Sequence, residues 1–439
     1  MSIGPRIYNL FPLLAGPIAA WNSHLPRIEN MGFNWIFINP IQYPGFSGSL
    51  YAIKDFYRLH PLVQDSSPEE PDELVRNFVS AAKHHGMSVM MDLVINHTAK
   101  DSLLAEDHPE WFDHDESGLL KSPRAIDPAD TRRITVWGDL AEIGWNSKAH
   151  QDARISWFSD VIAHYISLGI RGFRCDAAYK VPAEVWKLLI DAARTRLPDI
   201  LFAAETLGCT ESQVLALEGA GFDFMFNSSK WWDFRAPWLL QQYEHNRKIA
   251  PSISFPESHD TERFSAELSA YGLDHAKTMK WYRLRYLFAA AFSTGVMIPM
   301  GYEYGFSHRL DVCKTRMGDW AAEAANPHFD LHDFIRNVNL AKQSCPTLNT
   351  ECPQRQISVQ GDPLVALWRE HENHFSLFLM NRDESIPRDF PALAILATAN
   401  GRRIAFSELT PGFAPVSLAM GESITVPPLE GRLFCGQLT

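Results

Sequence analysis

The stretch "GIRGFRCDAAYK" (169–180) joins a short apolar run to two opposite charges near its end. Arg174 and Asp176 are two positions apart, so in a β-strand their side chains point to the same face. In parallel barrels, charged residues at the carboxyl ends of strands face the active-site mouth. The stretch therefore predicts a buried parallel strand that carries an ion pair at its functional end.

Eight short apolar runs of this kind alternate with helix-length segments along the chain. Segments 71–86, 152–169 and 183–197 carry apolar residues at three- and four-residue spacing, which predicts helices. The alternation predicts an α/β fold, a (β/α)8 TIM barrel, rather than a doubly wound sheet. The expected strands are 6–11, 33–41, 88–97, 169–178, 201–207, 222–227, 252–260 and 295–305.

Two segments depart from this alternation and predict additional structure. The connection after the third strand is too long for a turn and rich in Asp, His, Pro and Trp, so we expect an inserted subdomain over 97–150. The barrel then comprises 1–96 and 151–345. Residues 346–439 contain alternating segments separated by turn residues, which predicts a C-terminal antiparallel β-sandwich domain.

Composition excludes several classes of protein. The net charge of −12 and the absence of Lys/Arg clusters argue against a nucleic-acid partner. No apolar run approaches the length needed to span a bilayer, and Pro12 and Pro17 interrupt the apolar stretch near the start, so we expect no membrane partner and a cytoplasmic location. The residues give no information on oligomeric state.

The six cysteines contain no CxxC pair and no regular spacing. This distribution indicates neither a zinc site nor a dense disulfide framework. We therefore expect reduced thiols. The cysteines are Cys175, Cys209, Cys313, Cys345, Cys352 and Cys435.

Polar residues gather where the expected strands end. Asp176, Glu205 and Asp260 follow three different strands, and in a barrel we expect these carboxylates to converge. Two carboxyl groups about 5 to 5.5 Å apart can cleave an acetal with retention, one as an ionised nucleophile and one as a proton donor. Arg174 would lower the pKa of Asp176, and the apolar approach to Glu205 would raise its pKa. His97 and His259 can donate hydrogen bonds to sugar hydroxyls.

Four segments resemble the conserved regions of the α-amylase family, glycoside hydrolase family 13. They are "DLVINH" (92–97), "GFRCDAAYK" (172–180), "ETLG" (205–208) and "FPESHD" (255–260), in the order of the family. The resemblance implies that Asp176 is the nucleophile and Glu205 the general acid/base, and that Asp260 binds and distorts the sugar in the first donor subsite. It places His97, Arg174 and His259 in that subsite. Tyr51, in "SLYAIKDFYRLHP" (49–61), is the implied stacking platform.

The resemblance implies a retaining enzyme that acts on α-1,4-glucosidic bonds of malto-oligosaccharides or α-glucans through a glycosyl-Asp176 intermediate. Whether water or a sugar accepts the glycosyl group stays open, and so does a trehalose- or sucrose-type glucosyl isomerase on the same scaffold. A non-catalytic relative is disfavoured because all three carboxylates are present.

Three further segments, 25–41, 107–118 and 301–306, are similar to bacterial maltosyltransferases that use maltose 1-phosphate. That likeness keeps maltosyl transfer as the alternative activity, with basic side chains in the insertion either holding the phosphate or forming a solvated face. Those relatives usually carry asparagine after the nucleophile, where this chain has Ala177, which removes a polar group from the phosphate side. The basic residues are Lys121, Arg124, Arg132 and Arg133.

No cofactor is expected, with a structural calcium as the open alternative. In relatives an asparagine at the place of Asn96 ligates calcium, and Asp139 is the next candidate ligand. Tyr179 and Lys180 occupy the stretch where the family has its calcium-ligating histidine. Three tryptophans in the insertion are candidate acceptor platforms, with burial in the insertion's own core as the alternative. They are Trp111, Trp137 and Trp145.

Overall fold

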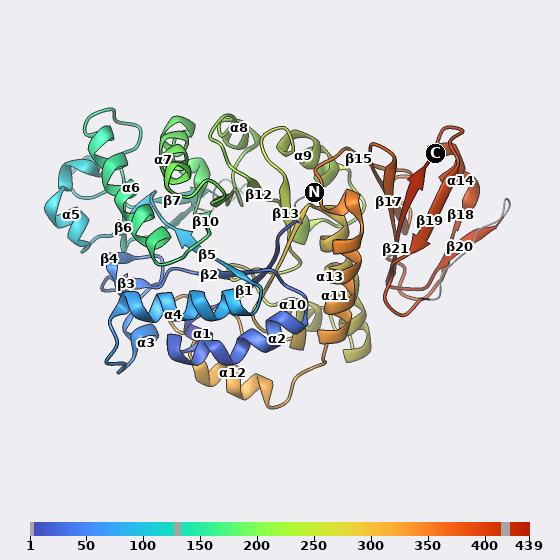
Figure 1. The fold of residues 1–439 in the computed structure, drawn as a ribbon, viewed down its shortest axis with the longest axis horizontal. Helices are drawn as coiled ribbons and strands as arrows, with labels where there is room; N and C mark the ends of the chain where they lie inside the picture. Colours follow the sequence, from blue (N-terminus) through green and yellow to red (C-terminus); the bar gives the residue numbers. More distant parts are fainter. Residues whose placement is uncertain (1–3, 127–131, 133, 414–421) are drawn as a thin grey trace.

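The computed structural model describes residues 4–126, 132, 134–413 and 422–439. Eight parallel strands form a closed barrel, which confirms the predicted TIM barrel (Figure 1). Each strand lies within one of the eight expected runs. Around the barrel they are β1 (Arg6–Leu10), β2 (Trp35–Ile38), β5 (Ser88–Leu93), β10 (Gly172–Cys175), β11 (Leu201–Ala204), β12 (Phe224–Phe226), β13 (Ser252–Ser254) and β14 (Gly295–Pro299).

The strands are buried on both faces, which explains their nearly continuous apolar runs. Ile7 of β1 belongs to the apolar cluster inside the barrel, together with Phe37 and Met90 from the two strands that follow. Tyr8, the next residue along β1, belongs to the larger cluster between the barrel and its helices. Both Ile7 and Tyr8 are fully buried.

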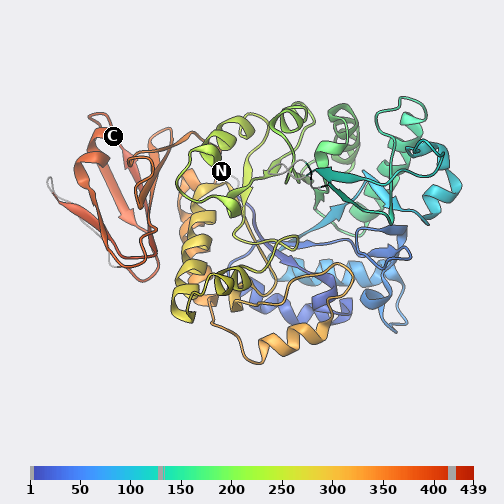
Figure 2. The ribbon, with the colours of Figure 1, turned by 180° about the vertical axis from the view of Figure 1, so that it is seen from behind.

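Helices surround the barrel (Figures 1 and 2). The three predicted helices are confirmed to within two residues at each end, as α4 (Pro71–His84), α6 (Gln151–Ser167) and α7 (Ala183–Arg196). The other helices are α1 (Pro12–Ala15), α2 (Leu25–Asn30), α3 (Pro61–Gln64), α5 (Leu103–Asp107), α8 (Glu211–Leu215), α9 (Trp238–Asn246), α10 (Phe264–Ala270), α11 (His275–Phe292), α12 (Met317–Ala324), α13 (His332–Ser344) and α14 (Ala392–Thr398). Within the described ranges, no helix has the length and apolar character needed to cross a membrane.

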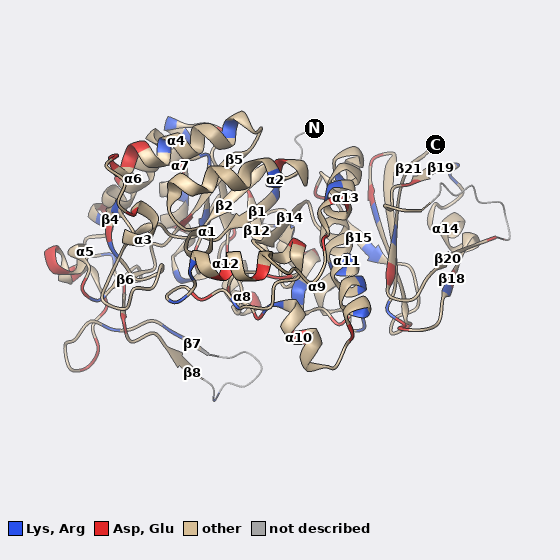
Figure 3. Cartoon of the chain, turned by 90° about the horizontal axis from the view of Figure 1, so that it is seen from below, with Lys and Arg blue, Asp and Glu red and all other residues tan. Residues whose placement is uncertain are grey.

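Small antiparallel sheets extend the carboxyl end of the barrel. β3 (Gln42–Pro44) pairs with β4 (Ile53–Leu59), and β6 (His97–Ala99) pairs with β9 (Leu140–Glu142). Between β6 and β9, the hairpin of β7 (Arg124–Ile126) and β8 (Ile134–Val136) projects from the body of the molecule (Figure 3). Strands β6 to β9 fall in the predicted insertion, whose definition as a separate subdomain over 97–150 stays a prediction.

The predicted C-terminal antiparallel β domain is confirmed, beside α11 and α13 (Figure 1). Its five-stranded sheet and the β18–β20 pair share one apolar cluster, which includes Trp368, Phe390 and Ile424. The predicted boundary at residue 346 and the sandwich form stay predictions. In sheet order the strands are β15 (Gln354–Gln356), β16 (Leu364–His371), β17 (His374–Asn381), β21 (Glu430–Leu438) and β19 (Ile404–Glu408), with β18 (Arg388–Pro391) paired to β20 (Ser423–Val426).

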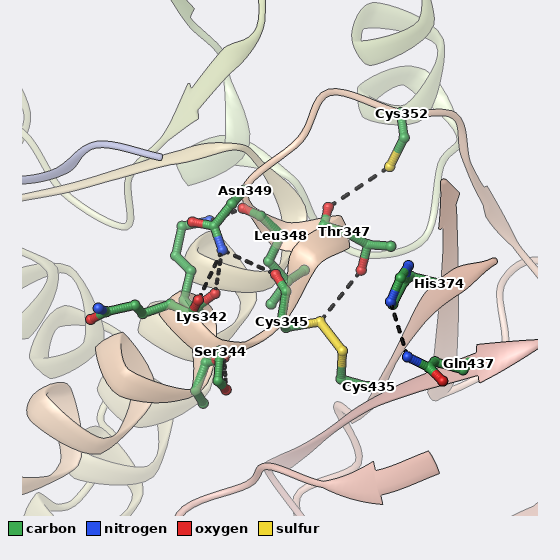
Figure 4. The surroundings of a disulfide bond; sticks show 12 residues. Lys342, Ser344, Cys345, Thr347, Leu348, Asn349, Cys352, His374, Cys435 and Gln437 are labelled. Atoms are coloured by element: carbon green, nitrogen blue, oxygen red, sulfur yellow. Dashed lines mark hydrogen bonds between the residues drawn. A yellow bond between two sulfur atoms is a disulfide. The ribbon is translucent and has the colours of Figure 1, made fainter. Parts of the chain in front are cut away.

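A disulfide joins Cys345, directly after α13, to Cys435 of β21 (Figure 4). The expectation of reduced thiols is therefore wrong for these two residues, while the other four cysteines are free. The partners are 90 residues apart in sequence, and only the docking of the C-terminal sheet on the barrel brings them together. The expected cytoplasmic location stays a prediction.

Removing this disulfide is expected to lower the free energy of unfolding by about 2 to 5 kcal/mol, because the bond constrains a long loop in the unfolded chain. Denaturant unfolding of wild type and of the double variant Cys345→Ala/Cys435→Ala measures the difference. Cys352→Ala is the matched control, since Cys352 is a buried free thiol close to the same turn. Equal stability of wild type with and without reductant would contradict a stabilising bond.

Candidate active site

Neighbouring strands bring the first two predicted carboxylates together. In the parallel pairing of β10 with β11, Cys175 lies opposite Ala204. Asp176 and Glu205 each follow these residues directly, so both side chains emerge at the same height of the barrel mouth. Asp260 reaches this point from the loop after β13.

Arg174 lies within 4 Å of four carboxylates, and its side chain is 4% exposed. Its Nη1 lies 2.7 Å from Asp176 Oδ1 and 2.9 Å from Asp92 Oδ1. Its Nη2 lies 3.9 Å from Glu205 Oε2 and 3.8 Å from Asp260 Oδ2. The three carboxylates singled out in the sequence therefore converge on one guanidinium.

Asp92, in strand β5, is the fourth carboxylate of this group. It lies opposite Arg174 in the pairing of β5 with β10. It accepts hydrogen bonds from Arg174 and, at 2.7 Å, from the Tyr51 hydroxyl. The sequence signal for this position was a charged residue, Asp92, inside an otherwise apolar strand.

The predicted subsite residues lie in the same place. The Tyr51 hydroxyl is 2.7 Å from His259 Nε2, and the two rings are parallel within 6°. His259 Nε2 is also 3.1 Å from Asp260 Oδ2. His97 Nε2 lies 3.2 Å from the Tyr51 carbonyl oxygen and donates to it.

The carboxyl groups differ in pKa because they differ in burial and in partners. Burial raises the pKa of Glu205 to about 7, although Arg174 opposes the shift. Burial likewise raises the pKa of Asp92 to about 6 against the attraction of Arg174. For Asp260 burial acts in the same direction, but His259 and Arg174 outweigh it and hold the pKa at about 2. Near neutral pH the mouth therefore holds both a proton donor and an ionised carboxylate.

The backbone between Asp176 and the 3-10 turn Ala178–Lys180 is strained at Ala177. This residue has φ 39° and ψ 51°, in the left-handed region that alanine rarely adopts. The conformation turns the Ala177 N–H toward Glu205 Oε2, to which it donates at 2.9 Å. The Leu207 N–H donates to the other oxygen, so the backbone fixes the Glu205 carboxyl from both sides.

Ala177→Gly is expected to raise the free energy of unfolding by about 1 kcal/mol, because glycine adopts this conformation without the steric cost of a Cβ. Greater backbone freedom beside Asp176 is expected to lower turnover at the same time. Thermal unfolding and steady-state kinetics of the variant test both effects. Ala203→Gly, in strand β11 with ordinary strand geometry, is the control and should lose stability. A loss of stability in Ala177→Gly would contradict the assigned strain.

A cavity of about 540 Å³ opens above these residues. The β7–β8 hairpin lines one part of it through Ala125 and Thr135, and two half-exposed tryptophans, Trp137 and Trp231, line it as well. Trp137 was a predicted platform, whereas Trp231 was not singled out in the sequence. For two other tryptophans the alternative of burial applies, since they are 5% and 2% exposed and belong to the large apolar cluster. These are Trp111 and Trp145.

The described residues that line the cavity carry mostly negative charge. Two cations, Arg174 and Lys180, face six carboxyl groups. The basic residues proposed from the sequence for a phosphate are not among them. Lys121 forms ion pairs with Glu142 and Asp113. Arg124 lies on the strand face opposite to Ala125, which lines the cavity. Arg132 is exposed, and Arg133 lies outside the described residues. The six carboxyl groups belong to Asp113, Asp139, Glu142, Asp176, Glu205 and Asp260.

The two candidate calcium ligands, Asn96 and Asp139, both line the cavity. Asn96 Nδ2 faces Asp176 Oδ2 at 3.4 Å, and its buried Oδ1 has no hydrogen-bond partner in the described structure. One amide oxygen falls short of the six to eight oxygen ligands of Ca²⁺. No three His, Cys, Asp or Glu side chains among the described residues form a metal-binding group.

Comparison with known proteins shows similarity to α-glucan enzymes. Residues 6–129 match the family model of the glycogen debranching enzyme glucanotransferase domain. An α-1,4-glucan:maltose-1-phosphate maltosyltransferase of Burkholderia pseudomallei is 26% identical over 94% of this chain and 36% of its own length. An α-amylase of Haloarcula japonica is 23% identical over 83% of this chain and 52% of its own length. The chain thus spans only a third to a half of these two relatives.

Solved structures share the whole fold. A maltogenic α-amylase of Thermotoga neapolitana aligns with a TM-score of 0.72 at 20% identity, over 99% of both chains. An α-amylase of Geobacillus thermoleovorans in complex with acarbose aligns with a TM-score of 0.77 at 16% identity, over 99% of this chain and 98% of its own. By this fold, these relatives and the four sequence motifs around Arg174, the chain is similar to enzymes of the α-amylase family.

Proposed function

We propose that the protein is a retaining glycosidase or transglycosylase that acts on α-1,4-glucosidic bonds of neutral malto-oligosaccharides or α-glucans. The observation that carries this proposal is the convergence of Asp176, Glu205 and Asp260 on Arg174 at the base of the cavity. The relatives, named as maltosyltransferases and amylases, support α-glucan as the class of substrate.

In the first step, Asp176 attacks the anomeric carbon while the glycosidic C–O bond breaks. Glu205 gives its proton to the leaving oxygen, and its pKa of about 7 keeps that proton available near neutral pH. The product is a glycosyl ester on Asp176. Arg174 donates a hydrogen bond of 2.7 Å to Asp176 Oδ1 and holds the attacking carboxylate in place.

In the second step, the Glu205 carboxylate removes a proton from water or from a sugar hydroxyl. The resulting nucleophile attacks the same carbon and releases Asp176, so two inversions give net retention. Asp260 and His259 contact the donor sugar, and the Tyr51 ring stacks against it. Trp137 and Trp231 provide apolar faces for the acceptor side.

A neutral donor fits the charge of the cavity. Carboxyl groups outnumber cations among the described lining residues even though Lys121 pairs with Asp113 and Glu142 and Glu205 keeps its proton near neutral pH, and this disfavours a phosphate dianion. Ala177 also offers no side-chain hydrogen bond to a phosphate. Maltosyl transfer from maltose 1-phosphate is the second candidate, because two relatives that align with 94% and 81% of this chain carry that name.

Product analysis after incubation with maltoheptaose, with and without inorganic phosphate, tests the two candidates. We expect oligosaccharides of altered length and no effect of phosphate. Phosphate-dependent release of maltose 1-phosphate would establish the second candidate. Incubation with trehalose and sucrose tests the isomerase alternative, and no turnover of any α-glucoside would overturn the proposal.

We further propose that turnover needs no cofactor and no calcium ion. The carboxylates of Asp113 and Glu142 near the insertion are neutralised by Lys121, whose Nζ lies 2.9 Å from Glu142 Oε2 and 3.5 Å from Asp113 Oδ2. Dialysis against EDTA is therefore expected to leave kcat and the melting temperature unchanged. A loss that added Ca²⁺ restores would contradict this.

A further inference from the structure

A chain of buried amides leads from the barrel wall to the mouth. Asn9 of β1 and Asn39, which directly follows β2, are both fully buried. Asn9 Nδ2 donates to the Phe37 carbonyl at 3.2 Å and to Asn39 Oδ1 at 2.8 Å. Asn39 Nδ2 then donates to the Tyr51 hydroxyl at 3.0 Å.

The direction of these hydrogen bonds is fixed at the backbone end. A carbonyl oxygen only accepts, so the contact with Phe37 requires the NH₂ group of Asn9. The same NH₂ group meets Asn39, which must present its oxygen there and its own NH₂ group to Tyr51. Asn39 therefore acts as a donor toward the hydroxyl.

A tyrosine hydroxyl has one hydrogen and two acceptor positions. With Asn39 donating, the hydrogen of Tyr51 goes to Asp92 Oδ2 at 2.7 Å, since a carboxylate accepts. His259 Nε2, at 2.7 Å, must then be the nitrogen that carries hydrogen. All hydrogen-bonding positions of the Tyr51 hydroxyl are thereby occupied, which leaves its ring face for a ligand.

His259 Nε2 also contacts Asp260. The hydrogen on His259 Nε2 lies between the Tyr51 oxygen and Asp260 Oδ2, the latter 3.1 Å from the nitrogen. The Phe11 and Phe37 rings pack against the imidazole, so the rings of His259 and Tyr51 stay parallel. One amide thus orients an aromatic ring, an imidazole and a carboxylate.

We infer that Asn39 is a positioning residue for the reaction, because it sets the direction of the Tyr51 hydrogen bond and through it the orientation of Tyr51 and His259 at the donor subsite. The inference rests on the proposed function, since its effect is measured as turnover at that subsite. Burial and the nearby Asp92 raise the pKa of Tyr51 well above its ordinary value, so the hydroxyl keeps the hydrogen that it donates to Asp92.

Asn39→Asp tests the inference with almost no change in size. The introduced carboxylate still accepts from Asn9 but cannot donate to Tyr51, and it competes with Asp92 for the hydroxyl hydrogen. We expect kcat toward maltoheptaose to fall about 10- to 100-fold with little change in KM, because small misplacements of a donor-subsite group cost rate at this scale. In a Tyr51→Phe background, which has no hydroxyl to direct, the same substitution should cause no further loss.

Asn227→Asp is the matched control. Asn227 is a buried asparagine at the end of β12, bonded to Ser254 and Ser293 rather than to any carboxylate of the mouth. Its substitution measures the general cost of the same change inside the barrel. Melting temperatures of all variants separate loss of fold from loss of rate. Asn39→Ala, which adds no charge, replaces Asn39→Asp if the latter does not fold.

Three outcomes are decisive. A fall in kcat that is specific to Asn39 and absent in the Tyr51→Phe background supports the inference. An equal fall in kcat in both backgrounds, or a fall no larger than in Asn227→Asp, overturns the inference. The proposed function is unaffected by that result as long as the wild-type protein turns over an α-glucan. Absence of wild-type turnover on every α-glucan overturns the proposed function, and this inference with it.

Discussion

Asp176→Asn is expected to lower kcat toward maltoheptaose by about 10⁴-fold or more, with KM almost unchanged. An amide does not attack the anomeric carbon, so the covalent intermediate cannot form, and losses of a catalytic nucleophile are of this size. The substitution preserves the volume of the side chain, and its oxygen can still accept the hydrogen bond from Arg174 that the carboxylate accepts at 2.7 Å.

The fold is expected to survive this substitution. Arg174 keeps its two hydrogen bonds to Asp92, so its buried charge stays paired when Asp176 loses its own. We therefore expect a melting temperature close to that of wild type. A large drop would mean that the loss of turnover reports unfolding rather than chemistry.

Chromatography of the products from maltoheptaose measures the effect, with Asp113→Asn as the matched control. Asp113 also lines the cavity, but its carboxylate faces Lys121 rather than Arg174. The control should keep turnover within a few-fold of wild type. Wild-type turnover in Asp176→Asn would remove Asp176 from the reaction and with it the double-displacement mechanism.

The strands and the carboxylates were predictable from sequence because both depend on local pattern. An apolar run that ends in a charged residue marks the carboxyl end of a barrel strand, and this rule found Asp176, Glu205 and Asp260 independently of the family resemblance. The roles of these residues are not settled by the same rule. They depend on how the side chains share Arg174, which only the closed barrel determines.

The features that the sequence did not reveal depend on contacts between distant segments. Trp111 and Trp137 come from one insertion with the same composition, yet one is buried and the other lines the cavity. Cys345 and Cys435 are paired through the docking of the C-terminal sheet. Asn39 did carry the general signal, a polar residue after an apolar strand, but its partner Tyr51 lies in the loop between β3 and β4.

The pH dependence of turnover is expected to report the protonation of Glu205. Its pKa of about 7 means that the proton donor is lost as pH rises, so kcat/KM should fall about tenfold per pH unit above that value. Asp260, with a pKa of about 2, stays ionised throughout this range. The alkaline limb is therefore assigned to loss of the Glu205 proton and not to Asp260.

Glu205→Gln is expected to remove this alkaline limb and to lower kcat by about 10²- to 10⁴-fold, the usual contribution of a general acid. The amide keeps the size of the side chain but has no carboxyl proton to give. Rates between pH 5 and 9 for wild type and variant provide the measurement. An unchanged alkaline limb in the variant would assign proton donation to another group.

Stability gives a second test of the same pKa that does not depend on activity. The folded state raises the pKa of Glu205 from its ordinary 4.5 to about 7, so it binds the proton more tightly than the unfolded chain does. Its contribution to stability is complete below pH 4.5 and is lost as pH rises through 7, a cost of about 3 kcal/mol for a shift of about 2.5 pH units. The side chain is 9% exposed, so water screens little of this effect.

At pH 8 we therefore expect Glu205→Gln to be more stable than wild type by up to about 3 kcal/mol, while at pH 4.5 the two should be nearly equal. Urea unfolding at both pH values measures this. Asp260→Asn should behave in the opposite way, because the folded state lowers the pKa of Asp260 and its ionised form is the stabilising one at neutral pH. An equal gain in the free energy of unfolding for Glu205→Gln at both pH values would contradict this explanation. It would show that the gain does not come from removing a buried, ionised carboxylate.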